Sequence, residues 1–171
     1  MTAVELMKLE LARLHASFET VLAELTAEQL HRVPGGHPKT NHIAWGVWHY
    51  VRTEDNVVRY ILQNRRPIVW AEGGYADKLG LPPVAQGTGM SSEEAHALRI
   101  KDLGLFREYM SRVWASTDEF LARVDPAALD ATVTIKPLGE MPGIRALAQV
   151  CVSHGFTHIG EIELARTLVG A

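Results

Sequence analysis

The sequence predicts an all-α fold, a four-helix bundle formed by a single domain over residues 1–171. Four long segments carry apolar residues at three- and four-residue steps, the period of a helix that packs one face against its neighbours. The run Thr132-Val133-Thr134-Ile135 suggests a few extended residues, too few to found a sheet. We find no internal repeat and no linker that would divide the chain.

The composition excludes several classes of protein. Hydrophobic residues make up 47% and charged residues 22% of the 171 residues, as in ordinary globular domains with a sizeable core. A net charge of −3 gives no reason to expect nucleic acid or an anionic membrane as a partner. No apolar run reaches the roughly 18 residues of a membrane span, the N-terminus lacks the blocks of a signal peptide, and one cysteine excludes an intramolecular disulfide. We therefore expect a cytoplasmic protein with a small-molecule partner.

The first two long helices are predicted in the N-terminal part. Residues 3–25 form an amphipathic helix, and Thr26 then caps one short turn that ends at Pro34-Gly35-Gly36. The second long helix runs from Asn41 to about Asn64, with Thr40 or Asn41 as its cap. Its apolar stripe is interrupted by polar residues at core-like spacing, which is costly unless each one has a partner.

A connection over residues 66–91, rich in glycine and proline, joins the second and third helices. A connection of this length inside a compact domain is usually either functional or only partly ordered. We expect the third helix from Ser91 or Ser92 to about Val124, where Asp125-Pro126 stops it. The fourth helix begins at Pro142-Gly143 and runs to about Leu168.

Two histidines in the fourth helix, His154 and His158, are candidates for metal binding. They are four residues apart, so both imidazoles lie on one helix face, and neutral imidazole binds transition metals well. Two histidines at this spacing, without a third ligand, could also be core or surface residues that are satisfied by hydrogen bonds. Cys151 and Glu161 share the face. We expect Cys151 to be a small buried residue rather than a ligand.

The second long helix offers two candidates for a third ligand. His42 and His49 are seven residues apart, about 10 Å along the helix axis, so they cannot both reach one ion through bonds of about 2 Å. His49, near the middle of the helix, is the predicted ligand. His42, near the helix start, is predicted to be a capping or entrance residue.

These residues resemble the DinB-like superfamily of damage-inducible proteins. The resemblance includes the apolar run before His49 with Glu54 or Asp55 a turn later, the motif from His154 to Glu161, and the loop that contains Trp70 and Gly87-Thr88-Gly89. It covers most of the chain. In the last motif the family often has glutamine where this chain has Glu161.

The resemblance implies a four-helix bundle, often a homodimer, that binds a divalent metal such as Zn, Ni or Fe through His49, His154 and His158. Relatives include bacillithiol S-transferases and mycothiol-dependent maleylpyruvate isomerase, so a low-molecular-weight thiol is the implied cosubstrate.

Two functions follow as hypotheses. Three histidines leave a tetrahedral ion one position for water or a thiolate, which favours a metal-dependent thiol transferase or hydrolase acting on a small electrophile, with Glu161 and Arg52 assisting. An open pocket lined by Trp45, Trp48, Arg52 and the 66–91 loop would support it. The alternative is a non-catalytic metal-binding bundle with a stress-response role. A purely structural bundle would bind no metal, and the absence of His-Glu-x-x-His argues against a zinc protease.

Overall fold

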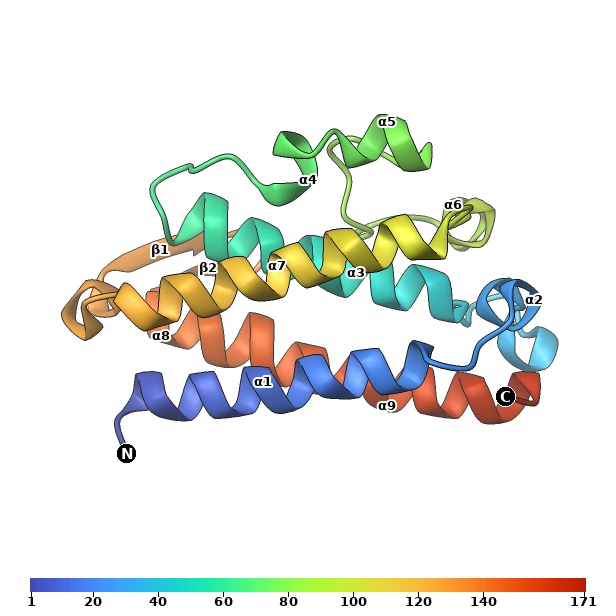
Figure 1. Cartoon of the computed structure of the whole chain (residues 1–171), viewed down its shortest axis with the longest axis horizontal. Coiled ribbons are helices and arrows are strands. Elements are labelled where there is room, and N and C mark those ends of the chain that lie inside the picture. The colour runs from blue at the N-terminus through green and yellow to red at the C-terminus, as the bar shows by residue number, and fades with distance from the viewer.

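The computed structural model describes residues 1–171 and is mostly helical, as predicted. The long helices α1 (Ala3–Leu22), α3 (Ile43–Asp55), α7 (Leu103–Arg123) and α9 (His154–Val169) lie lengthwise beside one another (Figure 1). Helix α9 contacts both α1 and α3, and α7 contacts the same two helices from the other side of the core. No helix is both long and apolar enough to cross a membrane.

The first two helices both begin with a capping box, and the second begins at the predicted cap, Thr26. Helix α1 opens with a capping box, in which Thr2 Oγ1 accepts from the Glu5 amide and the Glu5 carboxylate accepts from the Thr2 amide. It ends at Leu22, three residues earlier than predicted. Thr26 caps the short helix α2 (Ala27–His31) in the same way, and the 3-10 turn η1 (Pro34–Gly36) follows.

The second and fourth long helices each contain a π-helical segment that the sequence did not indicate. Helix α3 continues into η2 (Asn56–Ile61), and the last helix runs from α8 (Gly143–Ala146) through η4 (Leu147–Ser153) into α9. π segments in helices are frequent at functional sites because they shift the side chains that follow. Here η4 ends directly before His154.

The predicted third helix, from residue 91 to about 124, is wrong in its first part. The chain forms a short helix α6 (Ser92–Ala97), leaves helical geometry, and starts again at α7. The side chain of Asp102 caps α7 by accepting from the Leu105 amide at 2.9 Å, while Leu98 and Ile100 between the helices are buried. The connection before α6 also contains two short helices, α4 (Val69–Glu72) and α5 (Tyr75–Leu79).

The run 132–135 does form a strand, paired in a two-stranded hairpin. Strand β1 (Thr132–Ile135) lies antiparallel to β2 (Gly139–Pro142), with Thr132 opposite Pro142 and Ile135 opposite Gly139. The 3-10 turn η3 (Pro126–Asp130) leads from α7 into the hairpin. The hairpin stays at the end of the helical core and founds no larger sheet, so the all-α prediction holds.

The polar residues of α3 are buried and paired. Glu54 is fully buried, and its carboxylate accepts from Tyr50 at 2.6 Å, from Thr117 at 2.7 Å and from His15 at 3.0 Å. Asp55 accepts from the Val69 and Trp70 amides, so it fixes the start of α4 against α3. These hydrogen bonds offset the desolvation cost of the polar side chains.

Candidate metal centre

Three histidines from two helices converge on one point. His49 comes from α3 and His154 and His158 come from the first turns of α9. The Nε2 atom of His154 lies 3.3 Å from Nε2 of His49 and 2.9 Å from Nε2 of His158, and the three donor atoms all lie within 4.8 Å of one another. A tetrahedral ion with bonds of about 2.0–2.1 Å keeps its nitrogen ligands roughly 3.3 Å apart. The three histidines are therefore positioned to hold a metal ion.

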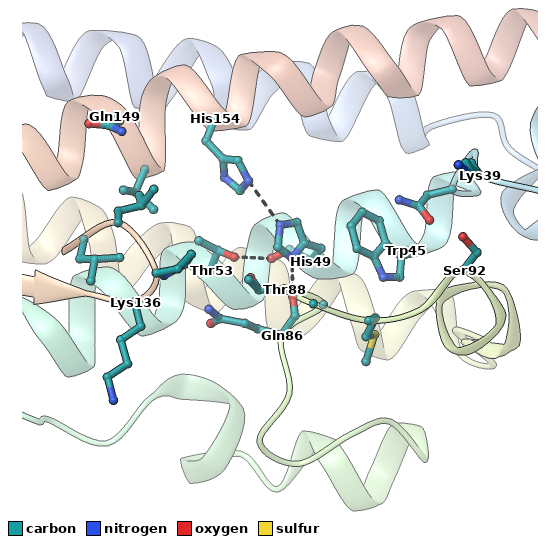
Figure 2. A pocket seen from close by; sticks show the side chains of 18 residues that line it. Lys39, Trp45, His49, Thr53, Gln86, Thr88, Ser92, Lys136, Gln149 and His154 are labelled. Atoms are coloured by element: carbon teal, nitrogen blue, oxygen red, sulfur yellow. Dashed lines mark hydrogen bonds between the residues drawn. The ribbon is translucent and has the colours of Figure 1, made fainter.

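The outer hydrogen bond of His49 fixes its tautomer. Its Nδ1 contacts the carbonyl oxygen of Gln86, which can only accept, so Nδ1 carries the proton. The lone pair of Nε2 then faces the other two histidines. The Trp45 indole stacks on the His49 ring at a centroid distance of 4.8 Å and holds its plane (Figure 2).

Glu161 acts on His158 in the same manner. Its Oε2 lies 2.8 Å from His158 Nδ1, one helical turn along α9, so Nδ1–H donates to the carboxylate and Nε2 keeps its lone pair. This hydrogen bond lowers the pKa of the Glu161 carboxyl. The carboxylate lies on the outer side of the His158 ring, not among the three Nε2 atoms.

The Nε2 atoms of the three histidines cannot all find hydrogen-bond partners among themselves. His49 and His158 both present lone pairs, so at most a single proton on His154 Nε2 lies between them. Lone pairs directed at a common point repel each other unless a cation lies among them, which is the electrostatic condition that a divalent ion meets.

Burial favours the neutral form of His49 and His154. It lowers the pKa of His49 to about 4, against a smaller opposite effect of the Gln86 carbonyl, and it lowers the pKa of His154 as well. Only the neutral imidazole has a lone pair for a metal. At neutral pH both rings are thus in the form that binds.

A cleft of about 520 Å³ opens onto this cluster. His49 and His154 lie in its wall, whereas His158 is behind them and 7% exposed. Figure 2 shows wall residues from several parts of the chain, among them Trp45 and Thr53 on α3, Gln86 and Thr88 in the connection, Lys136 at the hairpin tip and Gln149 on η4. The centre is therefore accessible from one side.

The connection between α5 and α6 approaches His49 very closely. Gly87 has a φ of +101°, and a Cβ added to it would lie 2.7 Å from His49 Nδ1 and 3.1 Å from the Trp45 ring. Only glycine fits both this backbone geometry and this contact. Together with Thr88 and Gly89, Gly87 forms part of the cleft wall.

A second glycine sets the position of α9. A Cβ on Gly155 would lie 2.3 Å from Leu14 and 2.6 Å from the ring of Tyr50, so α9 packs closely against α1 and α3 only because residue 155 has no side chain. This close packing directs His154, its neighbour, at His49.

Arg52 lies outside the histidine cleft. Its side chain is 2% exposed, its Nη2 faces the carbonyl oxygens of Pro83, Val84 and Ala85 at 3.2–3.5 Å, and its guanidinium stacks over Trp70 at 4.7 Å. These contacts hold the segment that ends at Gln86. Trp48, the other expected pocket residue, is fully buried in the core and lines no part of the cleft.

Two further predictions are confirmed. Cys151 is a fully buried free thiol, not a member of the histidine cluster, and burial raises its pKa well above the ordinary value. His42 caps α3, its Nδ1 accepting from the Trp45 amide at 3.0 Å, so the predicted cap at Thr40 or Asn41 is wrong. Sequence reasoning missed Gln86, whose backbone carbonyl carries no residue-specific signal. It also missed the hairpin tip at 136–138, because only the run 132–135 was expected to be extended.

Comparisons with known proteins agree with this fold. Residues 10–162 match the family model of the DinB superfamily. The crystal structure of a conserved protein from Enterococcus faecalis superposes with a TM-score of 0.84 over 100% of this chain and 99% of its own, at 21% sequence identity, a likeness of fold alone. No curated protein matches the sequence. Because the family model spans most of the chain and all three histidines, the chain belongs to the DinB superfamily.

Proposed function

We propose that this protein is a divalent-metal-dependent enzyme of the thiol-transfer or hydrolase type that acts on a small electrophilic substrate. The observation that carries the proposal is the convergence of three histidine nitrogens within 4.8 Å of one another at the wall of an open cleft. His49, His154 and His158 are the proposed ligands. A divalent ion bound there lowers the pKa of a water or thiol at its remaining position and so supplies a nucleophile at neutral pH.

The other residues of the centre have positioning roles in this proposal. Glu161 and Gln86 each accept the outer proton of a histidine and so keep Nε2 of that ring available. Arg52, predicted to assist the reaction, is proposed to do so by holding residues 83–85 and hence the Gln86 carbonyl. The cleft walls exclude bulk water from one side of the substrate.

The alternative is a non-catalytic metal-binding bundle with a stress-response role. The burial of His49 and His158, at 6% and 7% exposed, is the observation in its favour, because structural sites are closed. The cleft beside His154 favours the enzyme.

The experiment is a screen of small electrophiles with and without low-molecular-weight thiols, using protein loaded in turn with Zn²⁺, Ni²⁺ and Fe²⁺. Activity that disappears on chelation and returns with metal supports the enzyme. Activity that persists in the metal-free protein contradicts it. Metal binding without turnover of any substrate supports the alternative.

The assembly is part of the same proposal. A single domain over residues 1–171 and the homodimer implied by the family resemblance stay predictions. Light scattering on the purified protein measures the oligomer directly, and a monomer at all concentrations contradicts the dimer.

A further inference from the structure

The cleft at the histidines continues into two further clefts along the molecule. The second, of about 630 Å³, shares Gln86, Ile135 and Lys136 with the first. The third, of about 510 Å³, shares Asn56, Tyr60, Arg65 and Gln86 with the second. The three clefts therefore adjoin one another, from His49 past the hairpin tip to the end of η2, and together they are called the groove.

The charge of this groove differs from that of the whole protein. The chain carries 20 acidic and 17 basic residues, a net charge of −3. No aspartate or glutamate lines any of the three clefts, while four basic residues do: Lys39, Arg52, Arg65 and Lys136. A groove lined by charges of one sign attracts ligands of the opposite sign.

Two exposed basic side chains of the groove, Arg65 and Lys136, are left without acidic partners. Neither Arg65 nor Lys136 forms an ion pair, whereas Arg59, six residues before Arg65, is paired with Glu72 at 2.8 Å. Arg52, nearly fully buried beneath the third cleft, has no hydrogen-bond partner for Nε or Nη1. The nearby carboxylate of Asp55 accepts from the Val69 amide, the Trp70 amide and the Tyr109 hydroxyl instead.

The backbone that presents Arg65 is in an unfavourable conformation. Asn64 and Arg65 have φ angles of +51° and +64°, and they are the two residues other than glycine in the left-handed region. The Arg65 amide donates to the Tyr60 carbonyl at 2.7 Å, so these two residues end the η2 segment, as left-handed residues commonly do at helix C-termini. This turn fixes where Arg65 leaves the helix beside the groove.

We propose that this groove binds the anionic end, carboxylate or phosphate, of an elongated small molecule whose reactive end lies at the three histidines. Arg65 and Lys136 contact the anionic group, and Arg52 adds positive charge from beneath. Gln86 lines all three clefts and holds His49 through its carbonyl, so it joins the two ends of the site. The position of the reactive end rests on the proposed function; the anion site itself does not.

The test uses the full-length protein stripped of metal, so that a probe cannot bind through an ion. Tricarballylate and inorganic pyrophosphate are titrated separately by calorimetry at low ionic strength, where charge interactions are least screened. We expect a Kd of about 1 mM or tighter for at least one probe. The tighter probe identifies the anionic group as carboxylate or phosphate.

Variants locate the binding. Arg65→Gln and Lys136→Gln should each weaken it about tenfold, the loss expected for one charge-assisted contact. Arg66→Gln is the matched control, because Arg66 is adjacent, bonds only to Gln63 and lines none of the clefts. It should leave the Kd unchanged. The absence of binding by both probes, or equal weakening in all three variants, would overturn the proposal.

A further variant separates this proposal from the metal site. His154→Ala should bind the preferred probe as tightly as the wild type, because His154 is in the wall of the first cleft alone. If elemental analysis shows no metal at the histidines, the proposed function fails, while binding at Arg65 and Lys136 is unaffected. Loss of the anion binding in His154→Ala would contradict a separate anion site.

Discussion

His158 Nδ1 donates to Glu161 Oε2 at 2.8 Å, on the side of the imidazole opposite to the Nε2 atom that faces His154. Glu161 thus orients a candidate ligand and is not placed among the donor atoms. Glu161→Gln keeps an oxygen acceptor for Nδ1–H, so we predict that the variant retains metal, with affinity weakened by at most about ten- to a hundredfold. Competition with a coloured chelator measures this.

The pH profile of any metal-dependent activity should change more than the metal content, because a titrating carboxylate next to a ligand is removed. Complete loss of metal from a folded Glu161→Gln protein would make Glu161 a ligand. That result would favour a closed, non-catalytic site.

The close approach of Gly87 to His49 yields a second prediction. Gly87→Ala places a methyl group 2.7 Å from His49 Nδ1, so the ring or the Gln86 carbonyl must shift, and we expect weaker metal binding. Gly89→Ala is the control: its φ is also positive, +79°, but nothing lies within 4 Å of the added Cβ. Equal loss of metal affinity in both variants would show that backbone strain, and not the contact with His49, is responsible.

Two glycines of α9 provide a matched pair of variants whose free energies of unfolding test how the helix packs. Gly155→Ala introduces a methyl group 2.3 Å from Leu14, and overpacking of this kind costs about 1–3 kcal/mol of unfolding free energy. Gly160→Ala lies in the same helix with open space around the new Cβ, and should gain up to about 1 kcal/mol through helix propensity. Urea unfolding measures both. A neutral Gly155→Ala variant would refute the account of how α9 is positioned.

The cap of α3 predicts a dependence of stability on pH. Burial lowers the pKa of His42 from 6.5 to about 4. Between these two values the unfolded chain binds a proton at His42 and the folded protein does not, so acid favours unfolding. The stability that depends on neutral His42 is complete above pH 6.5 and declines as the pH falls towards 4.

His42→Asn tests this directly, since asparagine also caps helices but does not titrate in this range. The loss of unfolding free energy between pH 6.5 and 4 should be smaller in the variant. It should not vanish, because burial lowers the pKa of His31, His49 and His154 too. An unchanged slope would exclude His42 as a contributor.

The histidine cluster could be predicted from the sequence because helix geometry alone determines which of these histidines share a face and which are too far apart. The i, i+4 spacing fixes His154 and His158 on one face, and the rise of a helix separates His42 from His49 without any tertiary information. Capping residues such as Thr2, Thr26 and Ser91 likewise act within one turn, and all three cap the helices that follow them.

The parts that could not be predicted depend on contacts between distant segments. Gln86 binds His49 through its backbone, so the identity of its side chain gives no indication of this hydrogen bond. The apolar pattern continues on both sides of the break between α6 and α7, so the pattern does not reveal the break. Asp102, which caps α7, would fit equally well on the exposed face of one long helix. The hairpin at 132–142 is stabilised by its pairing, which a four-residue run does not reveal.

The central claim is that His49, His154 and His158 hold one divalent ion. Elemental analysis of protein purified without added metal, followed by equilibrium dialysis against Zn²⁺, measures it directly. The account predicts one equivalent of metal per chain in the wild type, most of it lost in each of His49→Ala, His154→Ala and His158→Ala, and retained in His42→Asn. Equal loss in His42→Asn, or a folded wild-type protein that binds no metal, would contradict it.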